Sequence, residues 1–184
     1  MGGRRAGCLV LAVGPSGAGK DTLLGLARRR LQGEARVVFG RRVVTRAADA
    51  SEDHDTLAPE AFDAAEARGE FVLSWRAHGH GYGVPRAATR GLWAGETVVF
   101  NVSRSVIDAA RRRFPRVRVV YVTAPPDVLA RRIAARGRDG DAVARLARAE
   151  ALDRRADADL VIDNVGDSAV HAGALAVFLL ATLA

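Results

Sequence analysis

The sequence predicts an α/β domain in which helices cover both faces of a mainly parallel sheet. Apolar runs of strand length alternate with longer amphipathic stretches, and a glycine-rich turn separates the first run from the first amphipathic stretch. The chain has 184 residues, of which 49% are hydrophobic, so it is long enough for one domain with a sizeable core. No repeat or long linker divides residues 1–184, so we expect a single domain.

Each element follows from its local pattern. Residues 8–13 are an unbroken apolar run, as expected for a buried strand. Residues 20–31 place Leu23, Leu24, Ala27 and Leu31 on one face of a helix, and Pro59 suits the first turn of a short helix over 59–68. Further strands are predicted at 37–39, 71–73, 97–102, 117–122 and 160–162, and further helices at 105–114, 126–136, 141–155 and 167–183.

One region interrupts this alternation. Residues 49–55 are polar and predict a loop, and residues 79–85 predict a glycine-rich turn. We interpret residues 41–90 as an inserted lobe, and residues 1–40 and 91–184 as the core.

Composition sets limits on location. Cys8 is the only cysteine, which excludes an internal disulfide and is typical of a reducing compartment. The apolar run 8–13 follows basic residues, as in a signal peptide, but it is short and Gly14-Pro15 ends it without a cleavage pattern. No apolar run approaches the roughly 20 residues of a transmembrane helix. We therefore expect a cytoplasmic protein with no membrane partner.

The net charge of +7 comes from arginine, since Lys20 is the only lysine. A basic chain can bind nucleic acid or a polyanionic small molecule, and guanidinium groups suit bidentate contacts to phosphate oxygens. A surface for single-stranded nucleic acid needs aromatic side chains among its basic residues, but aromatics make up only 5% of this chain. We therefore expect no nucleic-acid partner, and we interpret the arginine runs at 28–30, 111–113 and 154–155 as solvated helix faces.

The segment Gly14-Pro-Ser-Gly-Ala-Gly-Lys20 carries the strongest functional signal. It matches G-x-x-x-x-G-K and stands between a predicted strand and a predicted helix, which is the context of a P-loop NTPase. Glycines let successive backbone N–H groups surround the β-phosphate of ATP, and the helix N-terminus favours the negative charge. The predicted ATP-binding residues are Gly14, Pro15, Ser16, Gly17, Ala18, Gly19, Lys20, Asp21 and Thr22, with Lys20 also catalytic.

The position after Lys20 departs from the usual motif. It holds Asp21 where Ser or Thr is common, and Thr22 follows. A carboxylate is a hard oxygen ligand that suits Mg²⁺, and Thr22 lies about 100° further round the helix. We assign the metal to Asp21, although a carboxylate can also simply complement the helix N-terminus.

A second basic segment covers residues 131–148. Arg132 and Arg136 lie four residues apart on one helix face, and glycines at 137 and 140 flank a turn before Arg145. In a phosphoryl-transfer enzyme, such a segment can close over ATP as an arginine-rich lid. We therefore predict catalytic roles for Arg132, Arg136 and Arg145; the alternative is an arginine-rich surface helix pair.

These motifs together resemble the guanylate kinase family over essentially the whole chain. The resemblance implies ATP and Mg²⁺, an acceptor-binding lobe at 41–90, a lid at 131–148, and Asn164 beside the adenine. Arg42-Val-Val-Thr-Arg46 resembles the acceptor-phosphate motif R-x-x-T-R, Glu52-Asp-His54 resembles the loop after it, and His78-Gly with Tyr82-Gly resembles the H-G-x-x-Y-G segment.

Two positions depart from guanylate kinases. Guanylate kinases share carboxylates that accept hydrogen bonds from guanine. By the resemblance, the matching positions in this sequence are Arg76 and Asn101. Arginine cannot accept a hydrogen bond and asparagine lacks a charged pair of oxygens, so guanine is the wrong acceptor. Asp21, Ser74-Trp75 and Asn101-Val-Ser103-Arg104 are instead similar to the ribose 1,5-bisphosphate phosphokinases of this kinase fold.

This closer resemblance implies the transfer of phosphate from ATP to ribose 1,5-bisphosphate, giving ADP and 5-phospho-α-D-ribose 1-diphosphate. The predicted residues for this small phosphorylated sugar are Arg42, Arg46, Glu52, His54, Arg76, His78, Tyr82, Asn101, Ser103 and Arg104. The alternatives are a guanylate or other nucleoside-monophosphate kinase, and a guanylate kinase-like interaction module, which the retained Lys20 disfavours. The oligomeric state stays open, with a homodimer among the options.

Overall fold

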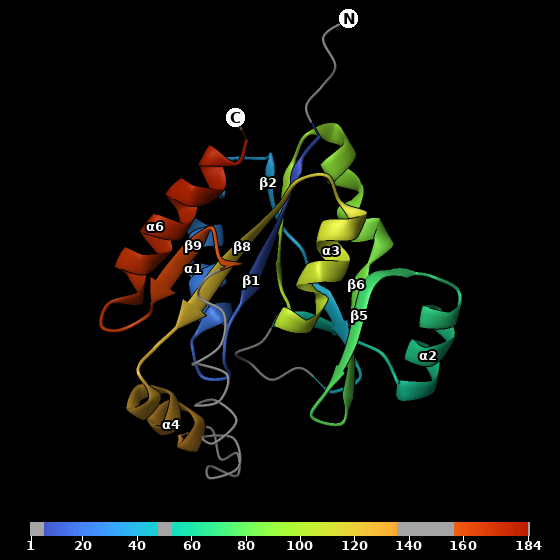
Figure 1. The fold of residues 1–184 in the computed structure, drawn as a ribbon, viewed down its shortest axis with the longest axis horizontal. Helices are drawn as coiled ribbons and strands as arrows, with labels where there is room; N and C mark the ends of the chain where they lie inside the picture. The colour runs from blue at the N-terminus through green and yellow to red at the C-terminus, as the bar shows by residue number, and fades with distance from the viewer. Residues whose placement is uncertain (1–5, 48–52, 136–156, 184) are drawn as a thin grey trace, which may run out of the picture.

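The fold is built on two sheets of different type (Figure 1). The computed structural model describes residues 6–47, 53–135 and 157–183. The first sheet has the strand order β2-β7-β1-β8-β9, and all of its neighbouring strands are parallel. Its strands are β1 (Cys8–Val13), β2 (Val37–Phe39), β7 (Thr97–Asn101), β8 (Val117–Thr123) and β9 (Leu160–Asp163).

Side-chain alternation along β1 produces the three layers. Cys8 and Val10 pack in the core cluster on the side of α1 (Lys20–Arg30) and α6 (Ser168–Ala181). Leu9 and Leu11 pack in the cluster on the opposite side, with α3 (Ile107–Arg113). Because successive side chains of a strand point to opposite faces, one apolar run supplies both cores. The predicted three-layer fold with a mainly parallel sheet is confirmed.

The second sheet lies between β2 and β7 in the sequence and has the order β4-β3-β6-β5. Its strands are β3 (Arg42–Val44), β4 (His54–Thr56), β5 (Phe71–Ala77) and β6 (His80–Pro85), and α2 (Pro59–Ala67) packs against it through Phe62. The chain enters this sheet directly from the end of β2, so Gly40 and Arg41 connect the two sheets. Short helical segments follow at Arg86–Ala94, which the sequence did not predict, and at Arg104–Val106.

The prediction of a turn over 79–85 was wrong, because residues 80–85 form β6. The turn itself is His78-Gly79, whose φ values of 50° and 75° fit the two-residue hairpin turns that follow the twist of a β-ribbon. Gly81 and Gly83 stand in the strand because the rings of Phe62 and Phe71 lie where their side chains would be. Tertiary packing therefore placed glycines in a strand, and β5 extends to Ala77 rather than ending at residue 73.

The predicted loop over 49–55 was also wrong at its end, because His54 begins β4, which pairs in parallel with the unpredicted strand β3. Both strands have three residues, too few for a periodic pattern. The helix predicted over 126–136 is observed as α4 (Pro126–Ala134), and that predicted over 141–155 lies outside the described residues. Among the helices that are described, none has the length and apolar character needed to cross a membrane.

Candidate functional site

The loop between β1 and α1 has the backbone that its glycines predict. Gly14 and Gly19 have φ values of 141° and 84°, which side chains disfavour. A side chain at Gly14 would also collide with the Val122 carbonyl on β8. The Lys20 ammonium group donates hydrogen bonds to the carbonyl oxygens of Gly14 and Pro15, at 2.8 and 2.9 Å. The loop therefore curls around its own lysine and keeps that positive charge at the mouth of the loop.

Two predicted residues from distant segments brace this loop. Asn164, which follows β9, is 1% exposed, and its side-chain amide donates to the carbonyl oxygen of Ala18 at 2.8 Å. The guanidinium group of Arg132 on α4 donates to the carbonyl oxygen of Asn164 at 3.0 Å. A side chain at Gly19 would meet the Asn164 amide. The structure thus brings Asn164 and Arg132 to the P-loop, with the Asn164 side chain buried against the loop.

Asp21 lies at the centre of a second group of contacts. Asn101, at the end of β7, donates a hydrogen bond from its side-chain amide to Asp21 Oδ1 at 2.7 Å. Arg42, the first residue of β3, donates to the Asn101 carbonyl oxygen at 2.9 Å and lies 3.9 Å from Asp21 Oδ2. Thr22 is exposed. The Asp21 carboxylate is therefore oriented by residues from both sheets, whereas Thr22 faces solvent.

Arg42 has an incomplete set of partners. Its side chain is 12% exposed, and its Nε is buried without a hydrogen-bond partner among the residues that the structure describes. Its guanidinium group also lies over the ring of Tyr82, 6.0 Å from the centroid, and Tyr82 stacks on Trp75 at 5.3 Å. A buried guanidinium donor needs an acceptor, and an anionic ligand is one way to supply it.

These contacts border a cavity of about 60 Å³ between α1, β2, β7 and the start of the second sheet. Sequence reasoning missed two of its polar lining residues, Arg28 and Asp53. Arg28 lies seven residues after Asp21, on nearly the same face of α1, so helical spacing could have found it. Asp53 carried no such signal. The full lining is Asp21, Leu24, Gly25, Arg28, Phe39, Gly40, Arg42, Asp53, Val99 and Asn101.

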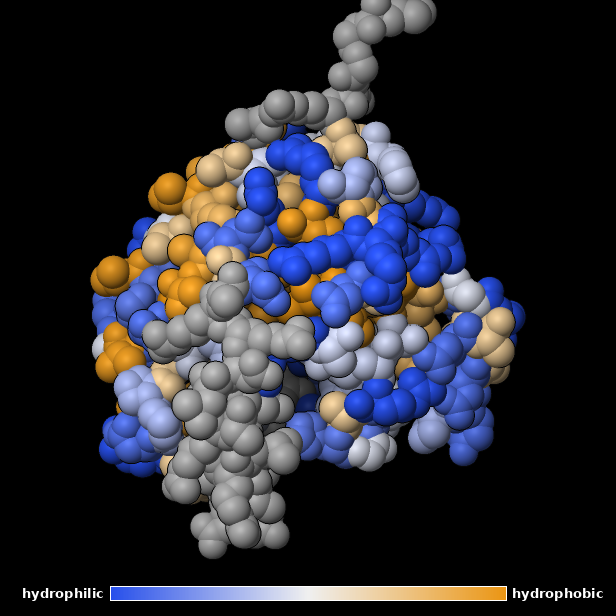
Figure 2. Space-filling view, viewed as in Figure 1, coloured by the Kyte–Doolittle hydropathy of each residue, from blue (hydrophilic) through white to orange (hydrophobic). Residues whose placement is uncertain are grey.

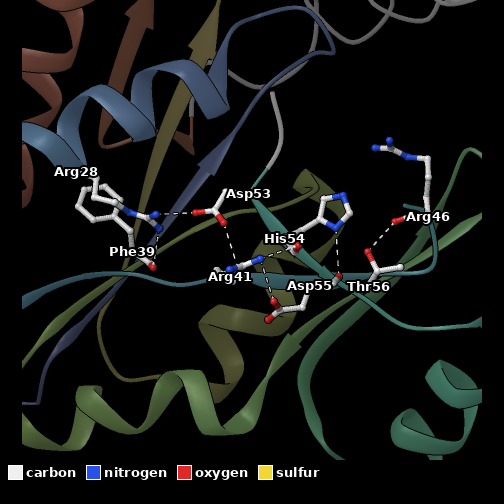
Figure 3. Close-up of polar contacts among 8 residues, drawn as sticks. All are labelled: Arg28, Phe39, Arg41, Arg46, Asp53, His54, Asp55 and Thr56. Carbon is white, nitrogen blue, oxygen red and sulfur yellow. Dashed lines mark hydrogen bonds and ion pairs between the residues drawn. The ribbon is translucent and has the colours of Figure 1, made fainter. Parts of the chain in front are cut away.

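Other predicted residues of the second sheet surround β4. His54 is 2% exposed, and its Nδ1 lies 3.2 Å from the Asp55 carbonyl oxygen. Arg46 follows β3, and its carbonyl oxygen accepts a hydrogen bond from Thr56 Oγ1 at 3.3 Å (Figure 3). Ser103 instead caps the short helix at Arg104–Val106, accepting a hydrogen bond from the Ser105 backbone.

Of the predicted acceptor residues that the structure describes, only Arg42 and Asn101 line the cavity, and Arg76 and His78 are positioned elsewhere. The Arg76 guanidinium group lies between Asp63 and Glu66 of α2, at 2.8 and 2.7 Å, and over the Phe62 ring. This hydrogen bond from Arg76, followed by one from Ser74, lowers the pKa of the Glu66 carboxyl group. His78 occupies the exposed hairpin turn. Glu52, Arg136 and Arg145 lie outside the described residues.

Comparison with known proteins agrees with this geometry. A guanylate kinase of Anaplasma phagocytophilum has a similar fold, with a TM-score of 0.73 at 21% identity over 96% of this chain and 86% of that one. No family model matches the chain. Two curated proteins named ribose 1,5-bisphosphate phosphokinase PhnN are more similar in sequence. The one from Methylobacterium radiotolerans is 57% identical over 87% of this chain and 90% of its own length, and the one from Rhodopseudomonas palustris is 53% identical over 90% and 84%.

The structural match confirms the guanylate kinase-like fold, and the sequence matches assign the branch within it. Both relatives align over most of this chain and over most of their own length. This chain belongs to the ribose 1,5-bisphosphate phosphokinase family.

Proposed function

We propose that this protein transfers the γ-phosphoryl group of ATP to ribose 1,5-bisphosphate, giving ADP and 5-phospho-α-D-ribose 1-diphosphate. The observation that carries this proposal is the environment of Arg42. A cavity beside the P-loop contains the buried guanidinium group of Arg42 with an unpartnered Nε, and its lining includes Asn101, which stands at one of the two positions where guanylate kinases have a carboxylate. That chemistry suits a phosphorylated sugar better than a purine base.

The P-loop provides the ATP end of the reaction. Backbone N–H groups of residues 16–19 would surround the β-phosphate. Lys20 would leave the carbonyl oxygens of Gly14 and Pro15 to contact the β- and γ-phosphates. Arg132, which already reaches this loop, would add positive charge beside the transferring group. Arg136 and Arg145 are proposed to contribute from the rest of the lid.

Asp21 fits a magnesium site of the kind found in kinases. Among the residues that the structure describes, no cluster of three or more His, Cys, Asp or Glu side chains could enclose a metal. One carboxylate beside the P-loop is nevertheless enough, because Mg²⁺ takes its remaining ligands from water and substrate phosphates. When bound, Mg²⁺ would neutralise charge on the ATP phosphates. Asp21, whose carboxylate is oriented by the Asn101 amide, would be its protein ligand.

The second sheet is proposed as the acceptor-binding lobe. Arg42 and Arg46 would bind the acceptor phosphates, with His54 and Tyr82 on the same sheet and Asn101 and Arg104 on the core side. The acceptor phosphate is already ionised at neutral pH, so the reaction requires no general base. Positioning of the two phosphates and neutralisation of their charge by Lys20 and the arginines account for the catalysis.

An assay of ADP release tests the proposal directly. Purified protein is given ATP and Mg²⁺ with ribose 1,5-bisphosphate, GMP or AMP in parallel. We expect efficient turnover with ribose 1,5-bisphosphate and little with either nucleotide. Turnover with GMP alone would show instead that the protein is a guanylate kinase with an unusual base site.

A further inference from the structure

Four charged side chains join the two sheets at the edge of the cavity (Figure 3). Asp53 immediately precedes β4, and its carboxylate contacts Arg28 on α1 at 2.6 Å and Arg41 at 3.2 Å. Arg41 also contacts Asp55 at 3.1 Å and donates to the His54 carbonyl oxygen at 3.0 Å. One carboxylate is therefore shared by a core helix and by the connection between the two sheets.

Arg28 extends the same connection into the core. Its guanidinium group donates to the carbonyl oxygen of Phe39, at the end of β2, at 3.1 Å, and lies over the Phe39 ring. The Asp53 carboxylate thus ties the start of β4 to α1 and, through Arg28, to the end of β2.

Asp53 is an unexpected residue in such a place. It lines the cavity proposed for a phosphorylated acceptor, where a carboxylate repels the phosphates and weakens binding. Arg28 and Arg41 offset that negative charge, and their contacts with Asp53 connect α1 to the second sheet. Each pair is about half exposed and would be weak alone, but contacts that share one ordered carboxylate form a network.

We propose that Asp53 is a positioning residue for the acceptor site: it fastens β4, and with it His54, to α1 and so holds the second sheet at the correct distance from the P-loop. This inference rests on the proposed function for its link to the acceptor. Asp53 acts through Arg28 and Arg41 and contacts neither phosphate.

Asp53→Asn tests the role, because it keeps the shape of the side chain and removes its charge. We expect the acceptor KM to rise about three- to tenfold while the ATP KM stays within about twofold. Repulsion alone predicts the opposite sign, since removal of a negative charge beside a phosphate should lower the acceptor KM. Asp53→Glu, which retains the charge, should recover part of the loss.

Glu70→Gln is the matched control. The Glu70 carboxylate contacts Arg68 at 2.6 Å, and this pair is about as exposed as the pair of Asp53 and Arg28. Arg68 and Glu70 both lie in the short connection between α2 and β5, so their contact does not join the two sheets. Glu70→Gln should leave the acceptor KM and the ATP KM unchanged. Arg41→Gln should raise the acceptor KM as Asp53→Asn does, and the double variant should show less than the product of the two effects.

Amide hydrogen exchange supplies a readout that needs no substrate. Asp53→Asn should speed exchange at the Leu57 amide, which donates to the Val44 carbonyl oxygen between β4 and β3, by about three- to tenfold. Faster exchange in a protein that does not turn over ribose 1,5-bisphosphate would uphold the tie and refute the proposed function. If the wild-type protein is active, an acceptor KM that is unchanged or lowered in Asp53→Asn would overturn the positioning role. If the wild-type protein is inactive, an exchange rate at Leu57 that Asp53→Asn leaves unchanged would overturn it.

Discussion

The side-chain amide of Asn101 donates a 2.7 Å hydrogen bond to the Asp21 carboxylate, and this contact joins the two halves of the site. Asp21 lies in the first turn of α1, the helix that follows the P-loop, whereas Asn101 ends β7. The carbonyl oxygen of Asn101 accepts a hydrogen bond from Arg42 of the second sheet. An amide can donate to a carboxylate, and a second carboxylate at this position would repel it. Asn101 therefore contacts both Asp21 beside the P-loop and Arg42 of the second sheet.

The first prediction concerns the metal. Asp21→Asn should raise the Mg²⁺ concentration that gives half-maximal activity more than Thr22→Val does, because the Asp21 carboxylate is oriented by Asn101 and Thr22 is exposed. The measurement is activity titrated against Mg²⁺ at saturating ATP. The reverse order of the two variants would assign the metal to Thr22.

The second prediction concerns the P-loop lysine. Lys20→Ala should reduce kcat by roughly 10²- to 10³-fold, because the charge of Lys20 is needed most as negative charge shifts in the transition state. Circular dichroism and thermal unfolding should show a folded protein. A folded variant with nearly normal turnover would refute the role of Lys20.

The third prediction concerns the acceptor arginines. A hydrogen bond from a charged group to phosphate contributes about 1.5–3 kcal/mol, so Arg42→Ala and Arg46→Ala should each raise the acceptor KM by roughly 10- to 150-fold. The ATP KM should stay nearly unchanged. Arg76→Ala should have little effect, because Arg76 is paired with Asp63 and Glu66.

Arg112→Ala is the control for this series. Residues 111–113 are all exposed, as the sequence predicted, but Arg113 donates to the Val72 carbonyl oxygen and Arg111 to that of Asp157. Arg112 is thus the cleaner choice. Equal increases in the two KM values for Arg42→Ala would show that the second sheet is not an acceptor site.

The fourth prediction concerns pH and stability. The hydrogen bond from Arg76 lowers the pKa of Glu66 in the folded protein. The ionised Glu66 carboxylate therefore contributes to stability at pH values above its unfolded pKa of about 4.3. That contribution is lost as the pH falls through the lower pKa of the folded protein. Since Glu66 is more than a third exposed, Glu66→Gln should cost only about 0.5 kcal/mol of unfolding free energy at pH 7.

Urea unfolding at pH 7 and near pH 3 measures this difference. The cost of Glu66→Gln should shrink at the lower pH, and it should also shrink at pH 7 in an Arg76→Ala background, where only the hydrogen bond from Ser74 remains. A cost that is the same at both pH values would mean that the Glu66 charge contributes nothing.

The sequence by itself determined the nucleotide end of the site. The P-loop is a local structure, in which glycines at fixed spacing follow a buried strand and precede a helix, so residues 14–20 carry the whole signal. The same is true of the long elements, since the apolar run of β1 and the helical pattern of α1 depend on neighbours in the chain. The prediction that guanine is not the acceptor also used only residue types, because arginine has no hydrogen-bond acceptor, but the structure pairs that arginine, Arg76, with carboxylates on α2 outside the cavity.

Tertiary structure alone decided the end of the site that we propose for the acceptor. Strands β3 and β4 are three residues long and polar in part, and only pairing with each other and with β6 makes them strands. Arg76 and Arg42 have the same chemistry, but Arg76 pairs with carboxylates on α2 while Arg42 lies beside the P-loop. Asp53 and Arg28 meet across 25 residues of sequence. A contact between residues far apart in the sequence depends on how the two sheets pack, and no local sequence pattern shows which distant residues will meet.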